Sequence, residues 1–235
     1  MPEAVVANAK LTRSLCITGR RADGYHLIDA EMVSLDLADR LTFSAGDALE
    51  VRGGGADVPG DDGNLVRKAL RVAGLTAHVV LIKRIPSGAG LGGGSADVAA
   101  VLRWAAVTDL ELAVRLGADV PFCVVGGRAR VTGIGEHVEP LAFEPLTFTL
   151  LTPPIHCSTL AVYAAWDDLG GPTTDGANDL EPAALLVAPE LARWRDRLGD
   201  ASGQTPVLAG SGSTWFVEGA HDGDGFVVVH TVPSA

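Results

Sequence analysis

Alternation of apolar and polar residues predicts β-strands in the first part of the chain. Residues 11–18 alternate loosely and residues 31–43 more clearly, with Val33 and Leu35 on one side. A period of two residues is typical of a strand that is buried on one face only. We therefore expect two half-buried strands with a polar turn at residues 19–24 between them.

Apolar residues with helical spacing predict several helices in the middle of the chain. Asn64 is placed to cap a helix that ends at Gly74. Further helices are expected over about 95–107 and 109–116, and the second of these ends at Gly117.

Other segments of this region are expected to form loop or strand. Residues 44–63 are rich in Gly and Asp, and we expect an exposed loop or hairpin there. The apolar run 78–82 predicts a strand, and the runs 120–125 and 127–132 predict a pair of strands.

A second unit follows in the last third of the chain. Its pattern predicts a strand at 147–151, a helix opened by Ser158, a helix over 182–198 that a proline weakens, and short strands at 206–217 and 225–232. Strands and helices mixed in this order favour an α+β architecture over a regular parallel βαβ repeat.

Charge narrows the classes of partner. The 235 residues include 18 Lys and Arg against 29 Asp and Glu, which gives a net charge of −11. Nucleic acids and anionic membranes are not expected as partners, because both are bound through clustered positive charge. A nucleotide-sized anion remains compatible with this charge, since a few backbone N–H groups suffice to hold a phosphate.

The cysteines and the N-terminal segment bear on the compartment. Cys16, Cys123 and Cys157 lie far apart and form no CxxC or Cys/His cluster, so neither a structural zinc nor a disulfide framework is expected. The N-terminal segment lacks the pattern of a secretory signal, and no apolar run is long enough to cross a bilayer. We therefore expect a cytoplasmic protein.

The segment that carries most information about chemistry is KRIPSGAGLGGGSAD, residues 83–97. Five of the seven residues from 88 to 94 are glycine, which leaves several backbone N–H groups free to point into one concavity. The helix that follows adds its unpaired N-terminal N–H groups and the positive end of its dipole. Together these groups form an anion cradle of phosphate size. A flexible linker is the alternative, but a linker is not held between a strand and a helix with Pro86 at its entry.

Two common nucleotide-binding loops do not fit this segment. Residues 88–93 match GxGxxG, but the acidic residue that a dinucleotide site needs about 20 residues later falls in LELAVRLGADV, which has the pattern of a helix and a turn. A Walker A loop ends in Gly-Lys-Ser or Gly-Lys-Thr, whereas this loop ends in Gly94, Ser95 and Ala96.

A third family does fit. PSGAGLGGGSAD resembles the phosphate loop of the GHMP kinases, the superfamily of galactokinase, homoserine kinase and mevalonate kinase. The triple glycine is similar to the branch that serves the non-mevalonate isoprenoid route. Further segments resemble the same branch in the same order, so the resemblance spans most of the chain. They are AKL at 9–11, GRRADGYHLI at 19–28, LGADVPF at 116–122, NDLE at 178–181 and GSGSTWF at 210–216.

This resemblance implies an α+β fold of two lobes with the active cleft between them. Residues 1–145 would form an ATP-binding lobe similar to ribosomal protein S5 domain 2, and residues 146–235 a ferredoxin-like lobe. The resemblance also implies ATP as co-substrate, with its phosphates over residues 86–97 and with Mg2+ bound through those phosphates. The implied acceptor is the 2-hydroxyl of a small molecule, a cytidine diphosphate-linked methylerythritol.

The resemblance also assigns two catalytic residues. A kinase acting on an alcohol needs an acceptor for the hydroxyl proton, and Asp119 in the turn GADVP matches the family's catalytic aspartate. Taken alone, an Asp at this place is more often a helix cap. Lys10 matches the lysine beside that carboxylate, where a cation keeps the carboxylate ionised and neutralises charge on the transferring phosphoryl group.

The binding residues that the resemblance assigns lie in several segments. An aromatic face with a neighbouring imidazole suits a pyrimidine base, although an aromatic residue on a helix is more often part of the core. The expected ATP-binding residues are Asn64, Leu65, Pro86, Gly88, Gly90, Leu91, Gly92, Gly93, Gly94 and Ser95. The expected substrate-binding residues are Tyr25, His26, Tyr163, Gly210, Ser211 and Gly212.

Some alternatives stay open. The family usually has a second serine where this chain has Ala96, and Asn and Leu where it has Thr12 and Arg13. A non-catalytic nucleotide-binding protein on the same fold is therefore one alternative, and a dinucleotide-dependent oxidoreductase is a more distant one. A GHMP kinase for another small alcohol is a further alternative, but a substrate without a base has no use for Tyr25 and His26.

Overall fold

A long β-hairpin organises the computed structural model, which describes residues 2–53 and 60–234. Its two strands, β1 (Glu3–Arg20) and β2 (His26–Ser44), pair antiparallel along their whole length and extend beyond the predicted 11–18 and 31–43. The register shifts three times along the pair, once between Asn8 and Lys10. Such bulges bend a strand and re-aim a side chain, and here one lies directly before Lys10.

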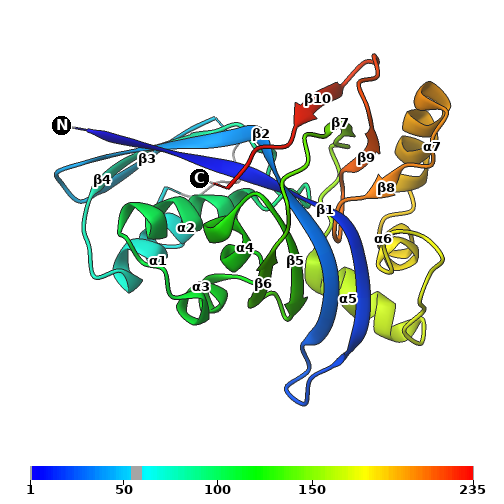
Figure 1. The fold of residues 1–235 in the computed structure, drawn as a ribbon, viewed down its shortest axis with the longest axis horizontal. Helices are drawn as coiled ribbons and strands as arrows, with labels where there is room; N and C mark the ends of the chain where they lie inside the picture. The colour runs from blue at the N-terminus through cyan, green and yellow to red at the C-terminus, as the bar shows by residue number, and fades with distance from the viewer. Residues whose placement is uncertain (1, 54–59, 235) are drawn as a thin grey trace.

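The hairpin is the centre of a six-stranded sheet with the order β3-β4-β2-β5-β6, in which β1 also pairs with β2. The first four helices of the chain pack beside this sheet, as can be followed in Figure 1. The added strands are β3 (Ala48–Gly53), β4 (His78–Lys83), β5 (Arg128–Gly133) and β6 (His137–Pro140). The helices are α1 (Leu65–Val72), α2 (Gly93–Trp104), α3 (Leu110–Leu116) and α4 (Val120–Val125).

Two expectations for this half are wrong. Residues 120–125 form the helix α4 and not a strand, because Pro121 stands in its first turn, where its missing N–H costs nothing, and because neighbouring elements bury it. A short apolar run does not distinguish the two structures. Within the segment 44–63, residues 48–53 form the edge strand β3, parallel to β4. Residues 54–59 lie outside the described residues.

The second half is a smaller sheet with three helices, so the mixed α+β class is confirmed. The strand order is β10-β7-β9-β8, with the helices beside it in Figure 1. The strands are β7 (Thr147–Leu151), β8 (Val207–Leu208), β9 (Trp215–Glu218) and β10 (Phe226–His230). The helices are α5 (Thr159–Asp168), α6 (Glu181–Val187) and α7 (Leu191–Ser202).

Local chemistry explains where these later elements break. The predicted helix over 182–198 is two helices, α6 and α7, interrupted at residues 188–190 around Pro189. The predicted strand 206–217 is the two strands β8 and β9 with a glycine-containing turn between them. The boundary between lobes at residue 145 stays a prediction.

The two sheets are tied together beside the site. Arg13 of β1 lies with Nη1 2.6 Å from Glu31 Oε1 of β2 and with Nη2 3.0 Å from Glu218 Oε1 of β9. An isolated bridge also pairs Leu35 with Thr231 near the C-terminus. Within the described part of the chain, no helix is both long and apolar enough to cross a membrane.

Candidate active site

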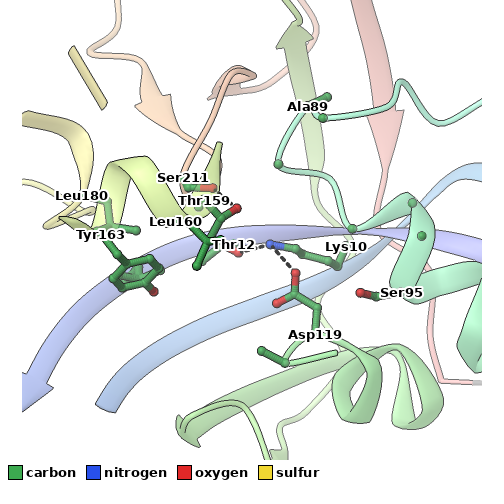
Figure 2. Close-up of a pocket in the computed structure, with 18 of the residues that line it drawn as sticks. Lys10, Thr12, Ala89, Ser95, Asp119, Thr159, Leu160, Tyr163, Leu180 and Ser211 are labelled. Carbon is green, nitrogen blue, oxygen red and sulfur yellow. Dashed lines mark hydrogen bonds and ion pairs between the residues drawn. The ribbon is translucent and has the colours of Figure 1, made fainter. Parts of the chain in front are cut away.

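A cavity of about 960 Å³ opens where the hairpin, the glycine loop, α1, α5 and the turn before α4 meet. It is lined by every site residue expected from the sequence except Leu91 and Gly212. Figure 2 shows that Lys10, Thr12 and Asp119 lie between the start of α2 on one side and the residues of α5 on the other. Residues from chain segments up to about 200 positions apart thus share one concave surface.

The glycine loop forms one wall of the cavity. Gly88, Gly90 and Gly92 have φ of +67°, +77° and +69°, values that side-chain-bearing residues rarely adopt. Gly92 is also the N-cap of α2, which begins at Gly93. The first N–H groups of α2 therefore have no intrahelical partner, and this helix end is suited to an anion.

Leu91 and Gly212 do not line the cavity but support the segments that do. The Leu91 side chain is buried in the core, while its carbonyl oxygen accepts the backbone N–H of Lys10 at 3.0 Å. Gly212 shapes the turn beside the loop, where its N–H donates to the Ala209 carbonyl at 3.0 Å. Neither residue lines the cavity, whereas their neighbours Gly90, Gly92, Gly210 and Ser211 do.

Lys10 and Asp119 form an ion pair inside the cavity. Lys10 Nζ lies 3.3 Å from Asp119 Oδ2 and donates to Thr12 Oγ1 at 3.0 Å, as the dashed lines of Figure 2 show. The lysine side chain is buried, whereas the aspartate is about one-third exposed toward the cavity. The ammonium is therefore fixed by two acceptors, and the carboxylate keeps an oxygen for a ligand.

A buried charge cluster that the sequence interpretation missed anchors both ends of the glycine loop. Asp39 of β2 accepts the N–H groups of Arg84 and Ile85 at 2.5 and 2.9 Å, and it also pairs with Lys83. Lys83 Nζ then reaches Asp97 Oδ2 in α2 at 2.7 Å. One ammonium thus joins the strand before the loop to the helix after it. The signal in the sequence was the charged pair that flanks the loop at both ends.

Asp97 is the member of this cluster whose ionised form is most disfavoured by its surroundings. Burial raises the pKa of Asp97 to about 7, against the opposing effect of Lys83 and with a further contribution from Asp39. Its Oδ1 is buried and has no hydrogen-bond partner among the described residues. A buried pair of carboxylates shares a single ammonium here, so one of them gains from carrying a proton.

The pKa of Asp97 predicts a pH-dependent stability. An unfolded Asp titrates near pH 4, so between about pH 4 and 7 the folded protein binds a proton that the unfolded chain does not. Stability is therefore greater at pH 5 and is lost as the pH rises through 7. We expect the melting temperature of Asp97→Asn to fall less than that of the wild type between pH 5 and 8. Parallel melting curves against pH would contradict this.

The hairpin turn and α5 form the far end of the cavity. Tyr25 is 59% exposed, whereas the His26 imidazole stacks on Tyr163 with ring centroids 4.8 Å apart and meets the edge of Trp166 at 5.5 Å. The His26 Nε2 lies 2.8 Å from Asp167 Oδ1. His26 and Tyr163, which were both expected near a base, thus stack on each other from two elements about 140 residues apart.

The segment NDLE supports the cavity, but the carboxylate of Asp179 does not line it. Asn178 donates to the carbonyl oxygens of Leu208 and Gly210 at 2.8 and 2.7 Å, which fixes the second glycine turn. Asp179 accepts the N–H of Ile17 at 2.8 Å and that of Thr174 at 2.9 Å. Both side chains are buried, so the motif holds the two halves in register.

The remaining expected residues lie at the edge of the cavity wall that the glycine loop forms. Asn64 caps α1 by accepting the N–H of Val66 at 2.9 Å, and together with Leu65 it lines the cavity near Gly94. Ser95 also lines the cavity, whereas Ala96 is buried in the core. A serine at position 96 would not face the cavity in this arrangement.

Known proteins match this chain over most of its length. The family profile "GHMP kinases N terminal domain" matches residues 64–127. The 4-diphosphocytidyl-2-C-methyl-D-erythritol kinase of Cereibacter sphaeroides (strain ATCC 17029 / ATH 2.4.9) is 38% identical over 242 aligned positions, which cover 89% of this chain and 87% of that protein. This chain belongs to the 4-diphosphocytidyl-2-C-methyl-D-erythritol kinase family. The enzyme of that name from Paracoccus denitrificans (strain Pd 1222) is also 38% identical, over 89% of this chain and 84% of its own length.

Solved structures agree with membership of the 4-diphosphocytidyl-2-C-methyl-D-erythritol kinase family. A crystal structure of 4-(cytidine 5'-diphospho)-2C-methyl-D-erythritol kinase superimposes with a TM-score of 0.76 at 30% identity and covers 98% of this chain and 99% of that one. Homoserine kinase from Cytophaga hutchinsonii ATCC 33406 superimposes with a TM-score of 0.61 at 16% identity, covering 98% and 95%. The expected GHMP kinase fold is therefore confirmed, and the protein is a small-molecule kinase.

Proposed function

We propose that this protein transfers the γ-phosphoryl group of ATP to the 2-hydroxyl of 4-diphosphocytidyl-2-C-methyl-D-erythritol, a step of isoprenoid precursor biosynthesis. One observation carries the proposal. The Lys10–Asp119 pair lies in the same cavity as the glycine loop at one end and the aromatic cluster of the hairpin and α5 at the other. The phosphates of ATP, the acceptor hydroxyl and the cytosine of the substrate would thus each meet suitable residues within one cavity.

The end of the cavity at the glycine loop suits a nucleoside triphosphate with its magnesium ion. Phosphate oxygens would accept N–H groups of the glycine loop and of the first turn of α2. The groups beside them are the Ser95 hydroxyl and the Asp119 carboxylate, both oxygen donors of the kind that Mg2+ takes together with phosphates and water. When bound, Mg2+ would neutralise charge that develops on the phosphate oxygens.

Two side chains act at the reacting centre in this proposal. Asp119 accepts a hydrogen bond from the acceptor hydroxyl, aligns its oxygen for in-line attack and receives the proton as the new P–O bond forms. Lys10, held by Thr12 and Asp119, supplies fixed positive charge where the phosphoryl group passes. Because both groups are already in place, little reorganisation is needed at the moment of transfer.

The far end of the cavity would hold the cytidine part of the substrate. Tyr25 is exposed at the end of the hairpin turn and Tyr163 of α5 lines the same cavity, and aromatic faces of this kind stack on bases. Ser211, whose Oγ lies 2.9 Å from Thr159 Oγ1, stands between this end and the Lys10–Asp119 pair. That middle position suits the diphosphate and the methylerythritol.

A direct assay tests the proposed function. The purified protein is incubated with Mg2+, ATP and the cytidine substrate, and the product is followed by phosphorus NMR and by mass. We expect one phosphoryl group to be added at the 2-hydroxyl, with ADP formed in equal amount. ATP binding without product, under conditions in which a characterised family member turns over, would reject the proposal and favour a nucleotide-binding protein without activity.

Thr12 offers a second, finer test of the same site. Replacing Thr12 by Val keeps the shape and removes the oxygen that accepts from Lys10 Nζ. An ammonium that loses one acceptor is held less firmly, so we expect kcat to fall by roughly tenfold with little change in the KM for ATP. Thr12→Ser keeps the hydroxyl and is the matched control. Equal kcat values for the two variants would show that this hydrogen bond is dispensable.

A further inference from the structure

Asp167 of α5 reaches across the cavity to the hairpin turn. Its Oδ1 lies 2.8 Å from Nε2 of His26, and its Oδ2 lies 3.4 Å from Nη1 of Arg20. It lines the same cavity as Tyr25 and Tyr163 but has no part in the phosphoryl transfer described above. Asp167 is thus a charged group at the base-binding end of the cavity, and phosphoryl transfer gives it no role.

The surroundings of His26 leave one ring nitrogen for a ligand. Tyr163 covers one face of the imidazole, Trp166 contributes an edge contact, and the side chain is 10% exposed. Asp167 takes Nε2, whereas Nδ1 has no hydrogen-bond partner in residues 2–53 and 60–234. The packing fixes the ring plane, so Nδ1 is the polar atom that the imidazole can offer to a ligand.

The carboxylate decides what Nδ1 offers. An ionised carboxylate only accepts hydrogen bonds, so Nε2 must be the nitrogen that carries the proton. In a neutral imidazole the other nitrogen is then an acceptor. The second oxygen of Asp167 pairs with Arg20, whose Nη1 lies 3.4 Å away, so each carboxylate oxygen has its own partner.

We infer that Asp167 is a positioning residue that keeps His26 in the Nε2–H form, so that Nδ1 accepts a hydrogen bond from the exocyclic amine of a cytosine and discriminates against uracil. Uracil carries a carbonyl oxygen where cytosine carries the amine, and two acceptors would then face each other. The inference rests on the proposed function only in taking a cytidine-bearing ligand to occupy this end.

Asp167→Asn reverses the pattern with almost no change in shape. The guanidinium of Arg20 only donates, so it retains the amide oxygen and turns the amide NH2 toward His26 Nε2. Nε2 must then accept, and Nδ1 carries the proton. We expect the variant to lose its preference for cytosine. Asp168→Asn is the matched control, because Asp168 is the exposed neighbour on the same helix with no partner among the described residues.

Binding of cytidine 5'-diphosphate and uridine 5'-diphosphate, measured by calorimetry, tests this without turnover. The wild type and Asp168→Asn are expected to bind the cytidine form more tightly, and Asp167→Asn to reduce that ratio by roughly 10- to 100-fold. Nitrogen-15 NMR of His26 should show the Nε2–H form in the wild type and the Nδ1–H form in Asp167→Asn.

Two results would overturn the inference. One is an unchanged ratio of the two Kd values in Asp167→Asn, and the other is a wild-type His26 that is protonated on Nδ1. Failure of the proposed function has a different signature, since a protein that does not phosphorylate the substrate can still prefer the cytidine diphosphate. The two measurements therefore separate the role of Asp167 from the identity of the reaction.

Discussion

Asp119→Asn is expected to lower kcat by about 1,000-fold, within the range of roughly 100- to 10,000-fold that a positioned acid or base contributes. An amide has nearly the shape of the carboxylate and still accepts a hydrogen bond from Lys10, which lies 3.3 Å away. It does not take up the proton of the acceptor hydroxyl, and it removes the negative charge that aligns that group. The loss should appear in kcat under saturating substrate.

Two controls separate this loss from damage to the fold. The Kd for ATP, measured by titration, should stay within a few-fold of the wild-type value, because the glycine loop that binds phosphate is untouched. The melting temperature should also change little, since Asp119 is partly exposed and its helix α4 begins without a side-chain cap bond. A kcat close to that of the wild type would remove Asp119 from the reaction.

Gly90→Ala is expected to destabilise the protein by about 3 kcal/mol, from a left-handed backbone that disfavours a side chain and from overpacking. A Cβ at position 90 would collide with the carbonyl oxygen of Ala209 and lie 2.8 Å from that of Gly212. Both atoms are backbone of the second glycine turn, which also donates from Thr214 N–H to the Ala89 carbonyl at 3.2 Å. The two halves of the protein meet at this contact and have no room to give.

Gly94→Ala is the matched control in the same glycine-rich segment. Position 94 lies inside α2 with no left-handed φ, and its Cβ would meet only the end of the Leu65 side chain at 3.0 Å. Alanine favours a helix over glycine by about 1 kcal/mol, which offsets a small shift of that leucine. Denaturant unfolding of both variants gives the comparison. Equal stability losses would show that the contact between the loop and the second turn carries no special weight.

The order of elements was largely predictable because local patterns fix it. The alternation in the hairpin, the cap at Asn64 and the glycine loop between a strand and a helix each depend on neighbours in sequence, and each is present as expected. The failures have local causes too. The run 120–125 was apolar throughout and had no period to separate a helix from a strand, and Pro121 in the first turn was the cue that favoured the helix.

The site was predictable to the extent that chemistry lies in contiguous motifs. Lys10, Asp119 and the glycines could be proposed from the sequence because each stands in a short recognisable segment, and the structure brings them to one cavity. Asp39 and Asp167 were not found, because nothing near them in the sequence marks them. The role of Asp39 becomes visible only through its contacts with the start of the loop, about 45 residues away. That of Asp167 becomes visible only through its contact with His26, 141 residues away.

Sequence alone determined the chemical inventory of this protein: a phosphate-sized loop of bare backbone, one carboxylate, one lysine and a few aromatic residues in a fixed order. Tertiary structure alone decided which of these groups touch. Lys10 faces Asp119 because a bulge in β1 and the turn before α4 meet at the cavity, and Lys83 holds a shared place between two buried acids. Charge pairs depend on separations of a few ångströms in a medium from which water is largely excluded, and such distances are set by the packing of segments remote in sequence.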